Sequence, residues 1–146
     1  MKDKQVAFLW FYTGVLLIGA AALISHADDL SIWWDETWSI FHSSRSLTQI
    51  ISEPDLLWPF GYFALLHLWS SIATLHEFAL RALSVFFGIL ATAFMIRAGR
   101  SLFSQTAGLL AGLAFGTSGY ARCFLLELRG YSPMLLLEAA FVYVYA

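Results

Sequence analysis

An uncharged apolar run near the N-terminus constrains this chain more than any other feature. Residues 7–24 contain no charged side chain, and a helix needs about 20 predominantly apolar residues to cross the hydrocarbon core of a membrane. The composition agrees, because 60% of the residues are hydrophobic and only 12% are charged, against roughly a quarter charged in soluble domains. The sequence therefore predicts an integral membrane protein. Its net charge of -2 provides no basic field for a nucleic acid.

Apolar segments along the chain predict an all-α, polytopic bundle with about four transmembrane helices. The third segment is rich in Gly and Ala, and Gly108 and Gly112 have the spacing that allows close helix–helix packing. Arg81 lies near the start of the second segment, where we expect its long side chain to snorkel to the interface. Glu138 lies inside the fourth, and an intramembrane acid usually faces a protein interior or a water-filled cavity. The expected spans lie near residues 7–24, 79–96, 107–120 and 133–146.

The distribution of cations predicts the orientation of the bundle. Lys2 and Lys4 precede the first span, and Arg97 and Arg100 follow the second. Cytoplasmic loops carry an excess of such residues, so we expect a multi-pass protein of the cell membrane with a cytoplasmic N-terminus. Residues 25–78 then form a long outer loop.

The outer loop contains a second apolar stretch, residues 58–75, which could be mistaken for a span. If this stretch crossed the membrane, the later arginines would move outside and the charge bias would break. We therefore expect it to lie in the outer leaflet, although its crossing stays open. Before it, four apolar residues recur with roughly helical spacing, which predicts an amphipathic helix on the membrane surface. They are Trp38, Phe41, Ile50 and Ile51.

A pair of acids, Asp35 and Glu36, follows the first span directly after Trp33 and Trp34. Indole rings prefer headgroup depth, so these carboxylates are expected where hydrocarbon meets water, within reach of a lipid-borne substrate. Acids are also favoured in the first turn of a helix. Catalysis and helix capping are therefore both open, and they do not exclude each other.

The order of these features resembles that of bacterial membrane glycosyltransferases of the GT-C class. The nearest likeness is the protein mannosyltransferase and aminoarabinose-transferase-like superfamily, and it covers the N-terminal part of such an enzyme. Four landmarks carry the resemblance in this chain, and each stands at the expected place relative to the spans. They are Trp34-Asp35-Glu36, residues 58–62 (WPFGY), Leu102-Phe103 followed by AGLLAGL at 107–113, and residues 127–131 (ELRGY).

The resemblance implies an inverting sugar transfer from a polyprenyl-phosphate donor to an acceptor hydroxyl at the outer face. Asp35 would be the general base, and Glu36 would assist it or contact a sugar hydroxyl. Arg129 would bind the leaving phosphate, because a guanidinium holds phosphate oxygens in a bidentate fork. The remaining substrate contacts would come from Glu127, Tyr131 and Tyr62. Whether a divalent cation takes part is open, with Asp35 and Glu127 as its candidate ligands.

Departures from the family pattern leave other functions open. Many relatives have His-Pro-Pro-Leu-Tyr-Tyr where this chain has Trp58-Pro59-Phe60-Gly61-Tyr62-Phe63, which weakens any lipid-phosphate contact expected there. Such enzymes are also much longer, so we expect the chain to be a fragment that works with a missing C-terminal part or with a partner chain. One alternative is a non-catalytic membrane protein that binds lipid or serves as a subunit. The other is a transporter or flippase-like bundle that uses Glu138.

Overall fold

The structure is a computed structural model that describes residues 2–27, 31–53 and 60–146, with the side chains of residues 2–4 left out. Trp58 and Pro59 of the sequence motif lie outside the described residues. The described chain folds into α-helices and contains no strand, as the sequence predicts. Its helices are α1 (Lys2–Ile24), α2 (Trp34–Ser43), α3 (Leu47–Ser52), α4 (Phe60–Ser70), α5 (Glu77–Leu102), α6 (Gln105–Thr117), α7 (Gly119–Leu126) and α8 (Tyr131–Tyr145).

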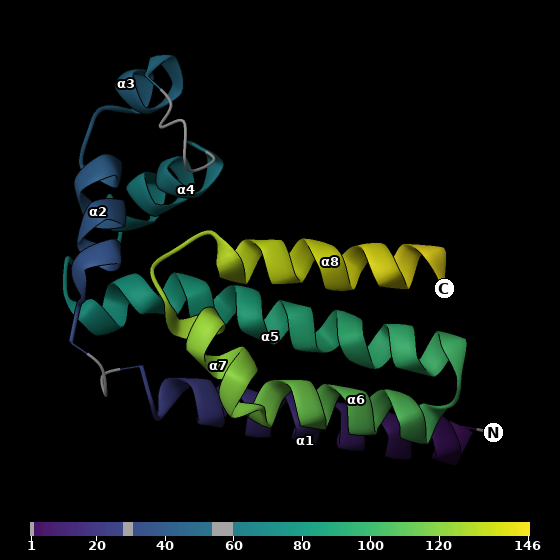
Figure 1. Cartoon of the computed structure of the whole chain (residues 1–146). Helices are drawn as coiled ribbons and strands as arrows, with labels where there is room; N and C mark the ends of the chain where they lie inside the picture. The colour runs from purple at the N-terminus through teal and green to yellow at the C-terminus, as the bar shows by residue number, and fades with distance from the viewer. Residues whose placement is uncertain (1, 28–30, 54–59) are drawn as a thin grey trace.

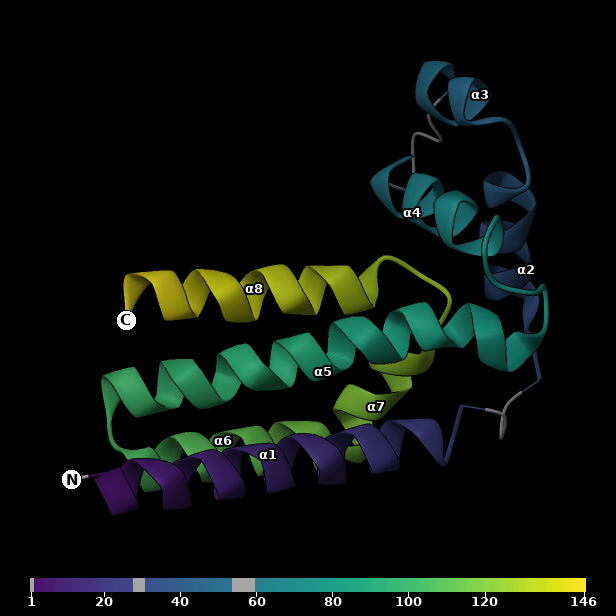
Figure 2. The same ribbon diagram turned by 180° about the vertical axis from the view of Figure 1, so that it is seen from behind.

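Four helices, α1, α5, α6 and α8, run side by side along one axis (Figure 1, Figure 2). α5 lies in the middle of the bundle and contacts α1, α6 and α8. The N-terminus, the α5–α6 turn and the C-terminus lie at one end, whereas α2, α3, α4 and α7 lie at the other (Figure 1). The segments expected on the outer side therefore share one end of the bundle, and those expected on the cytoplasmic side share the opposite end.

The expectation of four spans is met only in part. Two helices are long and apolar enough to cross a membrane by themselves, Gln5–Ile24 and Glu77–Leu102. The third expected span, residues 107–120, is broken, because α6 and α7 meet at an angle of 60° and qualify as one span only when taken together. α8 is apolar but has only 15 residues, fewer than the roughly 20 that a straight crossing needs. The described residues therefore provide two spans, or three with the bent pair.

The break between α6 and α7 has a local cause at Ser118. This residue has extended backbone angles, φ -62° and ψ 123°, so the helical hydrogen-bond ladder stops there. Its hydroxyl accepts a hydrogen bond from the backbone N–H of Ala121 at 3.3 Å, which is the contact that an N-cap residue makes with a new helix. Ser118 thus ends one helix and starts the next in a new direction.

Glycines set the distance between α5 and α6, as their spacing predicts. A Cβ on Gly108 would clash with the carbonyl oxygen of Ile96 and lie 2.7 Å from the backbone nitrogen of Arg100. A Cβ on Gly112 would overlap the side chain of Ile96. The two backbones therefore approach to a distance that only glycine permits, which is how helices pack where no hydrophobic effect drives them together.

The three short helices of the outer segment are fastened to one another and to the bundle. The ring Nδ1 of His67 lies 2.9 Å from the carbonyl oxygen of Ser43, which joins α4 to α2. The indole N–H of Trp69 donates to the carbonyl of Ala79 at 2.7 Å, which joins α4 to α5.

The expected amphipathic surface helix is two helices, α2 and α3. Trp38, Phe41 and Ile51 are exposed as expected for a membrane surface, whereas Ile50 is buried in a core cluster with Tyr62 and Phe63.

Candidate functional site

A buried ion pair joins α2 to α5 at the end of the bundle that carries α2, α3, α4 and α7. The Nη2 atom of Arg81 donates to Oε2 of Glu36 at 2.8 Å, and the two side chains are only 3% and 2% exposed. Nη1 of the same guanidinium donates to the carbonyl oxygen of Ala27 at 2.9 Å, just beyond α1. Arg81 therefore does not snorkel to the interface as the sequence suggested. It is held inside the protein because Glu36 supplies the opposite charge there.

Backbone donors complete the coordination of the Glu36 carboxylate. Oε1 accepts from the backbone N–H of Leu128 at 3.0 Å, and Oε2 lies 3.4 Å from the backbone nitrogen of Trp33. The first of these bonds ties α2 to the loop after α7, and the second caps the start of α2. Both oxygens thus have hydrogen-bond partners, and the Glu36 side chain also lines a cavity of about 260 Å³ together with Arg81 and Glu127.

The neighbouring acid faces the opposite way and is accessible. One carboxylate oxygen of Asp35 lies 2.5 Å from Nη1 of Arg129, and the Asp35 side chain is 42% exposed whereas that of Arg129 is 7% exposed. Successive residues of a helix differ in direction by about 100°, which is why Asp35 opens toward solvent while Glu36 points inward. The Trp-Asp-Glu and Glu-x-Arg-x-Tyr motifs, far apart in the sequence, therefore meet in this ion pair.

Two features hold Arg129 in place. Its backbone N–H donates to the carbonyl oxygen of Glu127 at 2.8 Å, which forms a tight turn directly after α7. Its guanidinium carbon lies 5.9 Å from the ring centroid of Tyr131, within the range of a cation–π contact. The carbonyl oxygen of Glu127 thus fixes the backbone of Arg129.

Tyr62 is a buried residue next to the site. It is 5% exposed, and its hydroxyl has no hydrogen-bond partner among the described residues. Ser84 lies beside it, but the Ser84 hydroxyl donates to the carbonyl oxygen of Glu127 at 3.2 Å. Burial raises the pKa of Tyr62 above its usual value. This buried, neutral phenol lies near the charges of Glu36 and Arg129, and its expected contact with a substrate stays a prediction.

Glu127 lines a cavity of about 260 Å³ beside the buried ion pair. Desolvation raises the pKa of its carboxyl group, nearby Arg129 opposes the shift, and the charges of Glu36 and Asp35 add to it. The described residues contain no group of three or more His, Cys, Asp or Glu side chains that could hold a metal ion. A divalent cation at Asp35 and Glu127 would take its other ligands from water or from the phosphate of a substrate, as Mg²⁺ commonly does, and this expectation stays a prediction.

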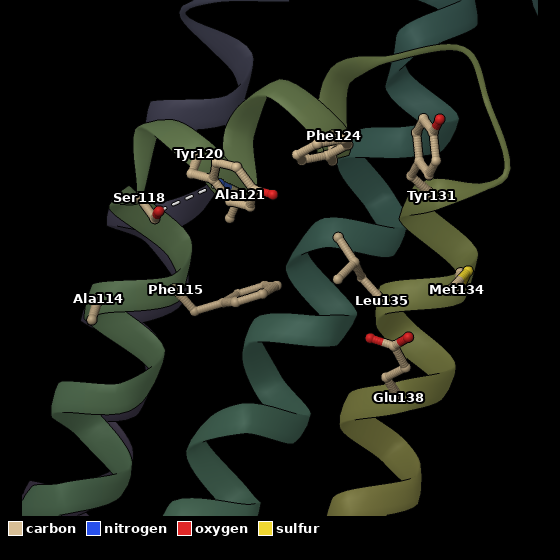
Figure 3. Close-up of a pocket in the computed structure, with 10 residues that line it drawn as sticks. All are labelled: Ala114, Phe115, Ser118, Tyr120, Ala121, Phe124, Tyr131, Met134, Leu135 and Glu138. Atoms are coloured by element: carbon tan, nitrogen blue, oxygen red, sulfur yellow. Dashed lines mark hydrogen bonds between the residues drawn. The ribbon is translucent and has the colours of Figure 1, made fainter.

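A larger apolar groove of about 470 Å³ opens between α6, α7 and α8. Figure 3 shows aromatic and aliphatic side chains along both sides and the carboxylate of Glu138 directed into the space. Tyr131 belongs to this groove and also carries the guanidinium of Arg129 on its ring. Tyr131 therefore connects the groove to the Asp35–Arg129 ion pair.

The sequence found most of this site and missed the residue that holds it together. Asp35, Arg129 and Tyr131 lie together, with only Asp35 widely accessible among the ion pair, whereas Glu36 and Tyr62 are buried. Arg81 was missed as the partner of Glu36. The available signal was an arginine inside an apolar helix, which needs a counter-ion when it does not reach water.

No family model matches the chain, and searches of curated proteins and of solved structures likewise give no match. The resemblance to GT-C glycosyltransferases therefore depends on the motifs and on their order along the chain.

Proposed function

We propose that this protein transfers a sugar from a polyprenyl-phosphate donor to an acceptor hydroxyl at the outer face of the membrane, with inversion. The observation that carries the proposal is the Asp35–Arg129 ion pair, which is accessible on its acidic side and adjoins an apolar groove through Tyr131. A lipid phosphate requires both elements, a fixed guanidinium for the phosphate and an apolar surface for the chain. The motif resemblance stated above points to the same donor class.

The ion pair also suggests how the reaction starts. The donor phosphate competes with Asp35 for Arg129, because a guanidinium binds phosphate oxygens in a bidentate fork. Once displaced, the Asp35 carboxylate is free to accept the proton of the acceptor hydroxyl. The hydroxyl oxygen then forms a bond to the anomeric carbon while the bond from that carbon to the phosphate oxygen breaks. The polyprenyl phosphate leaves with the bonding electrons, and Arg129 stabilises its charge.

The buried residues fix the distance between the Asp35 carboxylate and the Arg129 guanidinium. Glu36 fixes α2 against α5 through Arg81 and against the loop after α7 through the Leu128 N–H. Asp35 and Arg129 flank these anchors in sequence, so the same contacts determine their separation. Catalytic geometry must be held within fractions of an ångström, and a desolvated network supplies that rigidity.

Substitution of Asp35 separates this function from its rivals. The full chain is reconstituted with a fluorescent polyprenyl-phosphate sugar, and release of polyprenyl phosphate is measured together with donor binding. We expect Asp35→Asn to lower release by about 100-fold or more, as loss of a general base does, while donor binding persists. Arg129→Gln should abolish binding itself. Undiminished release by Asp35→Asn would show that Asp35 is not the base.

A second function is favoured by one observation. The Glu138 carboxylate faces the apolar groove (Figure 3), and an acid on a membrane helix commonly marks a transport pathway. Binding of the donor without release in the unmodified protein would favour a lipid-binding or flippase-like role. In that case Glu138→Gln, rather than Asp35→Asn, should impair activity.

A further inference from the structure

A pocket of about 270 Å³ lies at the end of the bundle opposite the candidate site, lined by Arg97, Arg100, Ser101 and Tyr143. All four side chains present hydrogen-bond donors, and two of them carry a full positive charge. The pocket joins the last turns of α5 to the last turn of α8, near the N-terminus of α1 (Figure 2). Lys2 and Lys4 belong to the start of α1, so half of the eight Lys and Arg residues of the chain belong to segments at this end.

Aromatic rings hold both guanidinium groups of the pocket. The guanidinium carbon of Arg97 lies 5.7 Å from the ring centroid of Tyr143, and Nη2 donates to the Tyr143 hydroxyl oxygen at 3.4 Å. The corresponding carbon of Arg100 lies 4.4 Å from the ring centroid of Phe8. Stacked guanidinium groups lose fewer conformations on binding a ligand than free ones, so the pocket is partly preorganised.

The charge of these two arginines is not neutralised within the described chain. Arg45, Arg81 and Arg129 each pair with a carboxylate. Neither Arg97 nor Arg100 forms such a pair with any described residue. Two fixed cations with no carboxylate partner in the described part of the chain, and with two hydroxyl groups beside them, match the oxygens of a phosphate group.

Exposed apolar side chains border the pocket and identify the source of the phosphate. Leu102 and Phe103 continue from α5, and Val144 and Tyr145 flank Tyr143 on α8; these four are 50%, 80%, 75% and 77% exposed. A free phosphate ion does not bind to an apolar surface, whereas the acyl chains of a lipid bury it. Basic pockets between membrane helices bind the headgroups of anionic lipids in this way.

We propose that Arg97, Arg100, Ser101 and Tyr143 form a binding site for the phosphate of an anionic phospholipid, separate from the sugar-transfer site. The headgroup phosphate accepts hydrogen bonds from the two guanidinium groups and the two hydroxyls. The acyl chains extend along the exposed side chains of α5 and α8. Because arginines in a last helical turn also stabilise the helix C-terminus without any ligand, the test must measure lipid selectivity rather than stability.

The experiment is native mass spectrometry of the full chain, released from detergent with equal amounts of phosphatidylglycerol and phosphatidylcholine. We expect the protein to retain phosphatidylglycerol in preference by roughly 10- to 30-fold, as two cations near a membrane surface provide. The double variant Arg97→Gln/Arg100→Gln should retain both lipids about equally. Arg122→Gln is the matched control, since Arg122 forms no ion pair with any residue that the structure describes and does not line the pocket, and it should keep the full preference.

Three outcomes overturn the proposal. The unmodified protein shows no preference between the lipids, the double variant keeps the preference, or excess inorganic phosphate displaces phosphatidylglycerol, which would identify free phosphate as the ligand. If the glutamine variant fails to fold, Arg97→Lys/Arg100→Lys replaces it. This variant keeps both charges but loses the fork and the stacking, so a reduced preference supports the pocket, and an unchanged preference shows that charge alone attracts lipid.

Discussion

Replacement of Glu36 by alanine tests the central anchor of the structure. The substitution removes the close carboxylate partner of Arg81, whose side chain is 3% exposed, and leaves the more distant and partly exposed carboxylate of Glu77 at 3.9 Å. Breaking a buried ion pair from one side costs about 3–5 kcal/mol, because the remaining charge stays buried without compensation. The Leu128 N–H, which donates to Glu36 at 3.0 Å, also loses its acceptor, and an unsatisfied buried donor costs about 1–3 kcal/mol.

These two terms overlap, because the structure relaxes around the vacancy, and Arg81 keeps its bond to the Ala27 carbonyl at 2.9 Å. We therefore expect a loss of about 3–5 kcal/mol in the free energy of unfolding for Glu36→Ala. That is a large share of the roughly 5–15 kcal/mol that stabilises a typical domain. Tryptophan fluorescence in dodecylmaltoside, titrated with sodium dodecyl sulfate, measures it, since the chain has six tryptophans.

Two companion variants make the result specific. Glu53→Ala breaks an exposed pair with Arg45, in which the side chains are 63% and 33% exposed and 3.7 Å apart, and should cost at most about 1 kcal/mol. Glu36→Leu combined with Arg81→Met removes both buried charges and should recover at least half of the loss. A cost for Glu36→Ala as small as that of Glu53→Ala would refute the buried anchor.

Three further predictions test packing, electrostatics and topology. Gly108→Ala places a methyl group against the backbone of α5, including a nitrogen 2.7 Å away, and should lower the melting temperature at a cost of about 1–3 kcal/mol, whereas Gly14→Ala, inside α1 with nothing within 4 Å, should not lower it, because alanine has the higher helix propensity. The folded protein raises the pKa of Glu127 above 4.5 and so holds that proton more tightly than the unfolded chain does. Stability should therefore fall as the pH rises through the window that starts near this value, and Glu127→Gln should flatten that part of the unfolding profile; an unchanged profile contradicts the assignment. In a background with Cys123 replaced by alanine, Glu77→Cys should react with an impermeant thiol reagent from outside, and Phe103→Cys only after the membrane is opened; the reverse pattern would invert the proposed orientation.

The helical class of the protein follows from the sequence alone, because it depends on local properties. A long uncharged apolar run can satisfy its backbone in hydrocarbon only as a helix, and α1 and α5 form where such runs occur. The packing role of Gly108 was equally readable, since the spacing of small residues on one helix face is a local pattern. The bend at Ser118 was not, because a single serine in an apolar stretch is compatible with a continuous helix as well as with a new N-cap.

The roles of the two acids in the site could not be predicted from the sequence, because they depend on tertiary packing. Asp35 and Glu36 are adjacent acids with the same chemistry, and nothing in their order tells which one is buried. The direction of α2 against α5 decides it: a rotation of about 100° per residue turns Glu36 toward Arg81 and leaves Asp35 to Arg129. The sequence thus predicted a pair of carboxylates just after the first apolar helix, and only the packing of helices distant in the chain decided which of them anchors the fold and which remains accessible.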